Sequence, residues 1–214
     1  MRTKITYYLS FVLLTFSVSG YTQVTDDFTD GDFINNPSWS GDNSEWEILS
    51  GQLHGIDSLA NDTFYLSTPS AISNPGQWEF WVNLKYNTSS LNYVKVFLTS
   101  DLADLQGNNS GYYVMLGGTT DEISLYEKNG VTAVKIIDGV DGILNSSNNI
   151  FKIKITRDAA NLWALQRDST GTGNFYVSEG TVTNSTFSAS GFFGLLVKQS
   201  TASFFGKQYF DDFY

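Results

Sequence analysis

Apolar residues fall at every second position in many short segments of this chain. In the segment 78–86, Trp78 and Phe80 share one parity, while Trp81 and Asn83 fall on the other. Successive side chains of a β-strand point to opposite faces, so this pattern predicts strands with one buried face and one open face. No stretch of ten or more residues repeats its apolar positions with a helical period. The chain is therefore predicted to be all-β.

Turn residues such as Asn129-Gly130 and Asp138-Gly139 separate thirteen segments that are expected to form strands. The segments are 46–49, 53–56, 64–67, 78–86, 93–100, 112–117, 122–128, 131–138, 151–157, 162–168, 175–179, 192–198 and 208–213. This number exceeds the seven to nine strands of an immunoglobulin-type domain and suits an antiparallel two-sheet jelly-roll sandwich. No linker rich in Pro and Ser interrupts them, so residues 23–214 are expected to form one domain.

The N-terminus has the three regions of a secretory signal. Arg2 and Lys4 precede an apolar run from Tyr7 to Val18, and a permissive cleavage position follows near Thr22-Gln23. The run is too short to span a membrane, and the alternative is a buried first helix. We therefore expect residues 1–22 to be a signal peptide and the mature chain to be secreted or displayed on the cell surface. No second long apolar stretch follows, so membrane insertion of the mature chain is not expected.

The balance of charge excludes one large class of partner. The chain has 12 Lys and Arg against 22 Asp and Glu, a formal net charge of −10, and the predicted signal peptide holds two of the basic residues. Such a chain repels phosphate backbones, so nucleic-acid binding is not expected. The sequence contains no cysteine, which excludes disulfides and a thiol nucleophile.

The tripeptide Asp-Asp-Phe occurs at 26–28 and again at 211–213. Similar acidic segments at both ends suggest a first and a last strand that lie side by side and close one sandwich. Asp27 and Asp212 alternate with phenylalanines that are expected to face inward, so both carboxylates should face outward. Carboxylate oxygens are hard ligands of the kind that Ca²⁺ takes, and these two are the candidate ligands of one structural calcium ion. Alternatively, they accept backbone N–H groups and pair with Lys or Arg.

The open faces of two consecutive strands carry aromatic residues. If segments 78–86 and 93–100 pair as a hairpin, their inward faces set the register, and Trp81 falls opposite Phe97 with Tyr93 nearby. We therefore expect these three rings to form an exposed aromatic strip. A patch of large exposed rings is more often an interaction surface than a feature without function.

In the same register, Asn83 falls opposite Lys95. Flat aromatic faces that stack on the C–H groups of a pyranose, beside side chains that hydrogen-bond its hydroxyls, are what a sugar site requires. Trp81, Phe97, Tyr93 and Asn83 are therefore the candidate ligand-binding residues, with a glycan as the expected partner. The alternative is that a loop or a neighbouring domain covers this face.

The acidic residues do not form the pattern that a glycoside hydrolase needs. A retaining mechanism places two carboxylates about 5 Å apart, and alternate residues of one strand can supply them. Glu45 and Glu47 offer only two carboxylates early in the chain, and Asp121, Glu122 and Glu127 do not share one parity. The single histidine, His54, has no Ser and Asp pattern around it. Catalytic activity is not expected.

Several segments resemble the N-terminal modules of certain large secreted bacterial surface proteins. These segments are Thr25–Phe33, Pro37–Asp42, Gly111–Gly118, Asp121–Tyr126, Phe151–Asp158 and Tyr209–Phe213. The modules look like concanavalin A-like lectin/glucanase, or laminin-G-like, β-sandwiches, and the resemblance covers essentially all of the chain after residue 22. It implies a concanavalin A-like fold, in which a structural calcium ion can join the terminal strands. It does not imply one ligand, because that superfamily includes lectins, hydrolases and adhesion modules.

These observations together favour a secreted, non-catalytic binding or adhesion module with carbohydrate as its preferred ligand. The second hypothesis is a structural spacer whose open aromatic residues pack on neighbouring domains of a larger surface protein. A glycoside hydrolase is the third.

Overall fold

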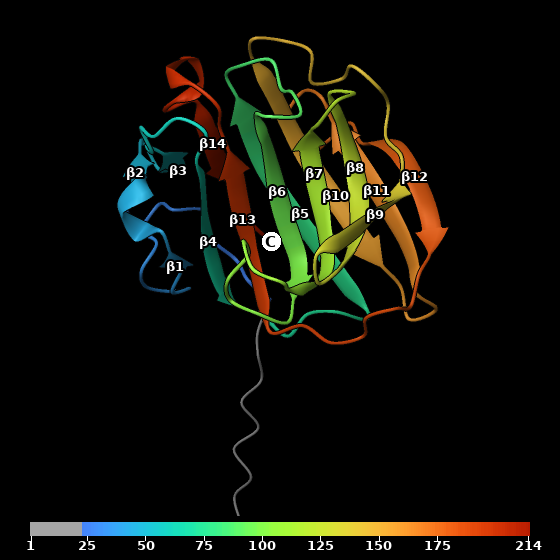
Figure 1. Cartoon of the computed structure of the whole chain (residues 1–214). Helices are drawn as coiled ribbons and strands as arrows, with labels where there is room; N and C mark the ends of the chain where they lie inside the picture. Colours follow the sequence, from blue (N-terminus) through green and yellow to red (C-terminus); the bar gives the residue numbers. More distant parts are fainter. Residues whose placement is uncertain (1–22) are drawn as a thin grey trace, which may run out of the picture.

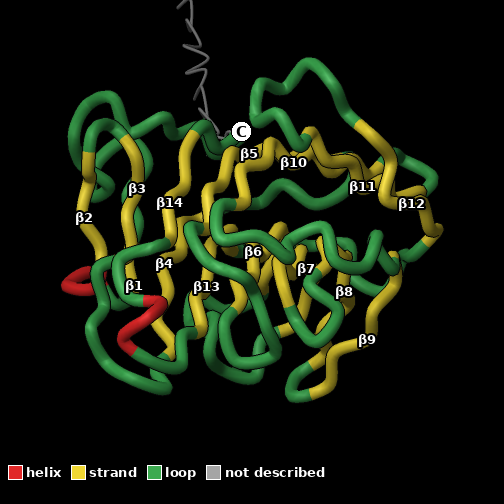
Figure 2. The backbone as a smooth tube through the Cα atoms, turned by 90° about the horizontal axis from the view of Figure 1, so that it is seen from above, coloured by secondary structure: helices red, strands yellow, loops and turns green. Residues whose placement is uncertain are grey.

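The computed structural model describes residues 23–214, which form a sandwich of two seven-stranded antiparallel sheets (Figures 1 and 2). Two single-turn 3₁₀ helices, Asn43–Glu45 and Ala202–Phe204, are the helical elements in this part of the chain. Within the same range, no helix is long and apolar enough to cross a membrane. The predicted all-β jelly-roll sandwich is confirmed. The predicted signal peptide, 1–22, lies outside the described residues.

The two sheets are named here the front sheet and the back sheet, after Figure 1. In spatial order, the front sheet consists of β1 (Ser40–Gly41), β4 (Thr63–Pro69), β13 (Phe192–Lys198), β6 (Tyr93–Ser100), β7 (Ser110–Gly117), β8 (Glu122–Asn129) and β9 (Thr132–Ile137). The back sheet consists of β12 (Val177–Thr183), β11 (Leu162–Asp168), β10 (Asn149–Arg157), β5 (Gly76–Leu84), β14 (Gln208–Asp211), β3 (Gln52–Gly55) and β2 (Trp46–Leu49). Each of the thirteen predicted segments overlaps one of these strands, and the two-residue β1 was not predicted.

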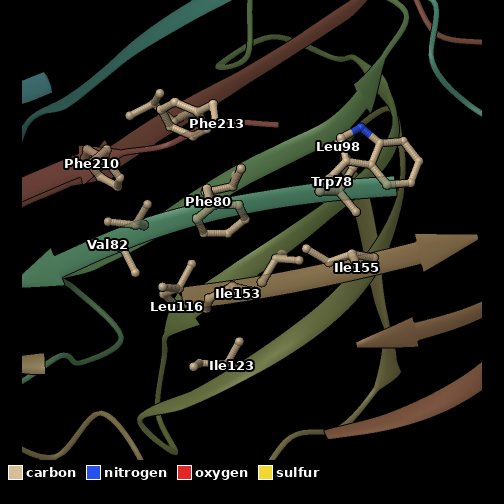
Figure 3. Close-up of a cluster of buried hydrophobic side chains, with 14 of the residues drawn as sticks. Trp78, Phe80, Val82, Leu98, Leu116, Ile123, Ile153, Ile155, Phe210 and Phe213 are labelled. Atoms are coloured by element: carbon tan, nitrogen blue, oxygen red, sulfur yellow. The ribbon is translucent and has the colours of Figure 1, made fainter. Parts of the chain in front are cut away.

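The hydrophobic core lies between the inner faces of the two sheets. Trp78, Phe80 and Val82 of β5 are buried there, together with Leu98 of the front sheet and Ile153 of β10 (Figure 3). The residues that period-two alternation assigned to the inside are therefore inside. Burying one parity of a strand in this way leaves its other parity on the outer face of the sandwich.

The predicted hairpin of segments 78–86 and 93–100 is wrong. β5 belongs to the back sheet and pairs with β10 and β14, whereas β6 belongs to the front sheet and pairs with β13 and β7. The chain between them crosses from one sheet to the other, so their apolar faces meet across the core. Trp81 and Phe97 consequently point away from each other, on opposite sides of the sandwich.

The two ends of the described chain lie side by side, as the repeated tripeptide predicted. Asp26 and Phe213 form an antiparallel bridge with backbone N–O distances of 3.0 and 2.8 Å. The rings of Phe28 and Phe213 meet edge to face at 5.9 Å, and both are buried. Asp27 and Asp212 are exposed, in agreement with the predicted parity. We call this junction the terminal clasp.

Asp26 is the buried acid of the terminal clasp. Its carboxylate accepts the backbone N–H of Phe28 at 3.0 Å and the indole N–H of Trp39 at 2.8 Å. These bonds favour the ionised form, but burial disfavours it more strongly and raises the pKa of Asp26 to about 6. The clasp therefore contains a carboxyl group that titrates near neutrality.

Asp26 is expected to make the protein more stable at mildly acidic pH. Its folded pKa of about 6 lies above the ordinary value of 3.8, so the folded state binds the proton more tightly than the unfolded state. Its contribution to the free energy of unfolding should therefore rise as pH falls from about 7 toward 4, by up to about 2 kcal/mol. Urea titrations of the wild type and of Asp26→Asn across this range measure it. The prediction fails if the two proteins have the same pH dependence.

Candidate functional site

The outer face of the front sheet carries a second, smaller apolar cluster. We call it the aromatic face, and its members are Tyr65, Tyr93, Phe97, Leu105, Tyr113, Met115, Tyr126 and Leu196. They come from β4, β6, β7, β8 and β13, and Leu105 comes from the loop after β6. Their positions follow from parity, because Val96, Val114 and Leu125 beside them point into the main core.

Strand register aligns the rings of this face in a row. Phe97 is opposite Tyr113, Tyr113 is opposite Tyr126, and Tyr126 is opposite Lys135 on β9. The Tyr113 and Tyr126 rings are parallel, with centroids 5.1 Å apart and an interplanar angle of 3°. The Phe97 and Tyr113 centroids are 5.2 Å apart. Three neighbouring strands thus present one continuous aromatic row.

The face has a buried floor and a more open rim. Phe97, Tyr113 and Leu196 are 1%, 2% and 4% exposed, whereas Tyr93 and Tyr126 are half-buried. The expectation that Phe97 is exposed is therefore wrong. It packs in the same cluster as Leu105, from the loop that follows its own strand. The accessible aromatic surface belongs to the tyrosines around it.

Lys95 lies in the middle of the aromatic face. Its ammonium is 5.3 Å from the ring centroid of Tyr93 and 5.0 Å from that of Tyr113. Burial lowers the pKa of Lys95, and the nearby positive charge of Lys128 lowers it further. Burial also raises the pKa values of Tyr93 and Tyr126, so their hydroxyl groups remain neutral hydrogen-bond donors. The face combines flat apolar rings, hydroxyl groups and one cation.

Trp81 and Asn83 lie on the other side of the molecule, on the outer face of the back sheet. Trp81 is half-buried between Lys152 and Asp211 in neighbouring strands. The loop after β11 partly covers it, since a Cβ atom added at Gly171 would lie 3.0 Å from its indole nitrogen. The structure therefore brings Tyr93 and Phe97 together and separates them from Trp81 and Asn83.

Asn83 is 7% exposed, and its side-chain oxygen is buried without a hydrogen-bond partner among residues 23–214. It lies between Ile150 and Tyr209 in the sheet rather than opposite Lys95. A ligand-binding role for Trp81 and Asn83 stays a prediction, now assigned to a different face from that of Tyr93.

Tyr113 and Tyr126 are site residues that the sequence analysis missed. The signal was present, because Tyr112, Val114 and Leu116 alternate with Tyr113, and Ile123 and Leu125 alternate with Tyr126. The same parity argument that placed Phe97 on an outer face would have placed these two rings there as well. Their adjacency to Phe97 could not be read in this way, because it depends on which strands pair.

Asp27 and Asp212 line one pocket of about 710 Å³ beside the terminal clasp. Asp212 forms an ion pair with Lys152 at 2.7 Å, and Asp27 accepts hydrogen bonds from the backbone and hydroxyl groups of Thr29. Within residues 23–214, no three His, Cys, Asp or Glu side chains gather in a group that could hold a metal ion. This donor set does not fit Ca²⁺, which takes six to eight oxygen ligands. The contacts agree with the alternative of backbone capping and pairing with a lysine.

A chelator is therefore expected to leave the thermal stability unchanged. The ammonium of Lys152 already neutralises Asp212, and only an ion bound to the folded state would add stability. Melting curves with excess EDTA and with millimolar CaCl₂ measure the effect. A lower melting temperature with EDTA, restored by CaCl₂, would contradict this expectation and support the calcium ion predicted from the sequence.

The carboxylates considered for catalysis have structural partners. These contacts are Glu45 with Ser44, Glu47 with His54, Asp121 with Thr88, Glu122 with Lys135, and Glu127 with Asn184 and Thr186. The ring of His54 also stacks on Tyr209 at 4.3 Å. These residues contribute to local packing and hydrogen bonding, and they supply no argument for hydrolysis.

The floor and rim of the aromatic face should differ in their effect on stability. Phe97→Ala removes a fully buried ring and should lower the free energy of unfolding by about 3 kcal/mol or more. Tyr126→Ala removes a half-buried ring and one stacking contact, which should cost about 1 kcal/mol. Urea denaturation of both variants measures the difference. Equal losses would show that the rim is as much a part of the core as the floor.

Neither a protein-family model nor a curated protein matches this sequence. The structure, however, is similar to solved structures of three sugar-binding domains. The carbohydrate recognition domain of Emp47p matches with a TM-score of 0.64 at 12% identity, over 93% of this chain and 97% of that chain. The exoplasmic/lumenal domain of VIP36, in a Ca²⁺- and Man-bound form, matches with 0.58 at 12%, over 82% and 80%.

The third structure is the carbohydrate-binding module CBM66 from Bacillus subtilis, with a TM-score of 0.54 at 15% identity, over 82% of this chain and 91% of that chain. At identities this low, the likeness establishes the fold alone. The chain has the concanavalin A-like, legume-lectin-like β-sandwich fold.

Proposed function

We propose that this protein is a non-catalytic carbohydrate-binding module of an exported protein, and that sugar binds on the aromatic face of the front sheet. The observation that carries the proposal is the row Phe97, Tyr113 and Tyr126, with Tyr93 and Lys95 beside it. The row lies on one outer face of a sandwich whose core is already complete without it.

The chemistry of the face suits a sugar. A pyranose has a flat apolar surface of C–H groups and an edge of hydroxyl groups, and rings with polar tips can contact both. Tyr93 and Tyr126 offer such rings at a half-buried rim. The buried floor holds the rim rings in place, so binding costs little side-chain entropy.

The comparisons support the same class of ligand. Emp47p and CBM66 are described as a carbohydrate recognition domain and a carbohydrate-binding module, and VIP36 as bound to Man. VIP36 also has a metal-free form with the same fold. The proposed binding on the aromatic face requires no metal ion, because Tyr, Phe, Leu and Met residues form that face and sugar would contact them directly.

A structural spacer remains the second candidate, because chain segments cover some of the aromatic residues. Leu105 packs with Phe97, and the loop after β11 reaches Trp81. In a spacer, Tyr93 and Tyr126 would pack on a neighbouring domain rather than on a sugar. The open rim favours the first candidate.

A glycan array probed with residues 23–214 tests the proposal. We expect binding to at least one glycan, and we expect Tyr93→Ala and Tyr126→Ala each to weaken it about fivefold, because stacking on each ring contributes on the order of 1 kcal/mol. Phe175→Ala is the matched control. It removes a ring that is 65% exposed in the loop before β12 and should leave affinity unchanged.

Trp81→Ala separates the two outer faces. If Trp81→Ala abolishes binding and the tyrosine variants do not, the sugar lies on the back sheet and the proposed site is wrong. If no glycan binds, the spacer function is the better account.

A further inference from the structure

An uncompensated cation lies at the centre of the aromatic face. The ammonium of Lys95 has no carboxylate within 4.0 Å and no hydrogen-bond partner among residues 23–214, whereas Lys135 and Lys152 both form ion pairs. Its contacts are the faces of Tyr93 and Tyr113. The carboxylates of Asp42 and Asp104 act on Tyr65 at the edge of the face, but they do not pair with Lys95.

The charges around Lys95 include one more lysine, and the charges of Asp101 and Asp104 act on that lysine. Lys128 is close enough to lower the pKa of Lys95, and its own ammonium bonds to neutral oxygens of Gly107 and Asn109. On the far side of the row, the acid Glu122 is already paired with Lys135. Lys95 is thus left as an unpaired cation between rings, although acidic residues lie at the edges of the face.

A partly buried charge without a counter-ion is unfavourable, because burial removes water without supplying a partner. Its lowered pKa reflects that cost. An anionic group on a ligand could pair with this desolvated ammonium. Hydrogen bonds between charged groups are stronger than hydrogen bonds between neutral groups. The rings of Tyr93 and Tyr113, on either side of Lys95, would at the same time contact the flat face of the ligand's ring that carries the anionic group.

We propose that the aromatic face selects a glycan that carries an acidic sugar, whose carboxylate or sulfate group pairs with Lys95 while its ring contacts Tyr93. This inference rests on the proposed function and deepens it. The acidic residue would be an isolated one within a neutral glycan, because the net charge of −10 repels densely charged polymers such as nucleic acids.

Matched glycosides test this selection. Methyl glucuronide, methyl glucoside and methyl glucoside 6-sulfate share one ring and differ at carbon 6, and NMR titration of residues 23–214 gives an affinity for each. We expect one or both acidic forms to bind about tenfold more tightly than the neutral form. Comparison of the carboxylate with the sulfate shows which group is preferred. Matched acidic and neutral glycans on the array extend the comparison to longer ligands.

Lys95→Gln should bring the acidic and neutral ligands to equal affinity without lowering the melting temperature, because it removes an unpaired charge. Lys95→Arg should keep most of the preference. Lys154→Gln is the matched control. Lys154 lies on the back sheet, with its ammonium 5.7 Å from the ring centroid of Tyr176, so this variant should keep the preference.

The outcomes separate this inference from the function on which it rests. If neutral and acidic ligands bind equally, and Tyr93→Ala weakens both, the acidic selection is wrong and the carbohydrate-binding function stands. If Lys95→Gln keeps the preference for acidic ligands, Lys95 is not the selecting group and the inference is wrong. If no glycan of any kind binds, the proposed function fails and the inference fails with it.

Discussion

Packing of two apolar sheet faces against each other is the constraint on which the rest of this structure depends. The longer strands of both sheets place one parity of side chains in the shared core, as Phe80, Val82 and Ile153 do. Removal of this apolar surface from water is the main driving force for folding. Once the inner parity is occupied, the other parity of every strand has to lie outside. The position of each candidate functional residue follows from that division.

The two outer faces then differ in what lies on them. On the back sheet, the loop after β11 approaches Trp81, and Asn83 is almost fully buried. On the front sheet, Phe97 and Tyr113 make a floor that is buried like a core, and the tyrosine rim stays partly open. A rigid floor beneath a partly open rim is a suitable base for a binding surface, because the rim side chains are already ordered before a ligand arrives.

Charge is distributed as unevenly as the aromatic residues. Acidic side chains outnumber basic ones, and several lie near the terminal clasp, where Lys152 pairs with Asp212 and burial raises the pKa of Asp26. On the aromatic face, by contrast, Lys95 lies against the rings of Tyr93 and Tyr113 without a carboxylate partner. Net charge argued against nucleic acid as a partner, but it did not reveal this unpaired cation, which depends on which side chains the fold brings together.

Much of the fold could be read from the amino-acid sequence alone. Alternation of period two located the strands and identified Phe80 as inward and Phe97 as outward. The repeated Asp-Asp-Phe tripeptide indicated that the chain ends meet. These are local properties, because the geometry of a strand dictates which face each residue takes.

The neighbours of each strand were decided only by the tertiary structure. β5 pairs with β10 and β14, and β6 with β13, although β5 and β6 are consecutive in the chain. Backbone hydrogen bonds between strands carry no signature of their partner in the sequence, and a connection of several residues can turn back within a sheet or cross to the other one. Parity therefore placed Trp81 and Phe97 on outer faces correctly. Their separation onto opposite faces, and the row that Phe97 forms with Tyr113 and Tyr126, came from long-range pairing.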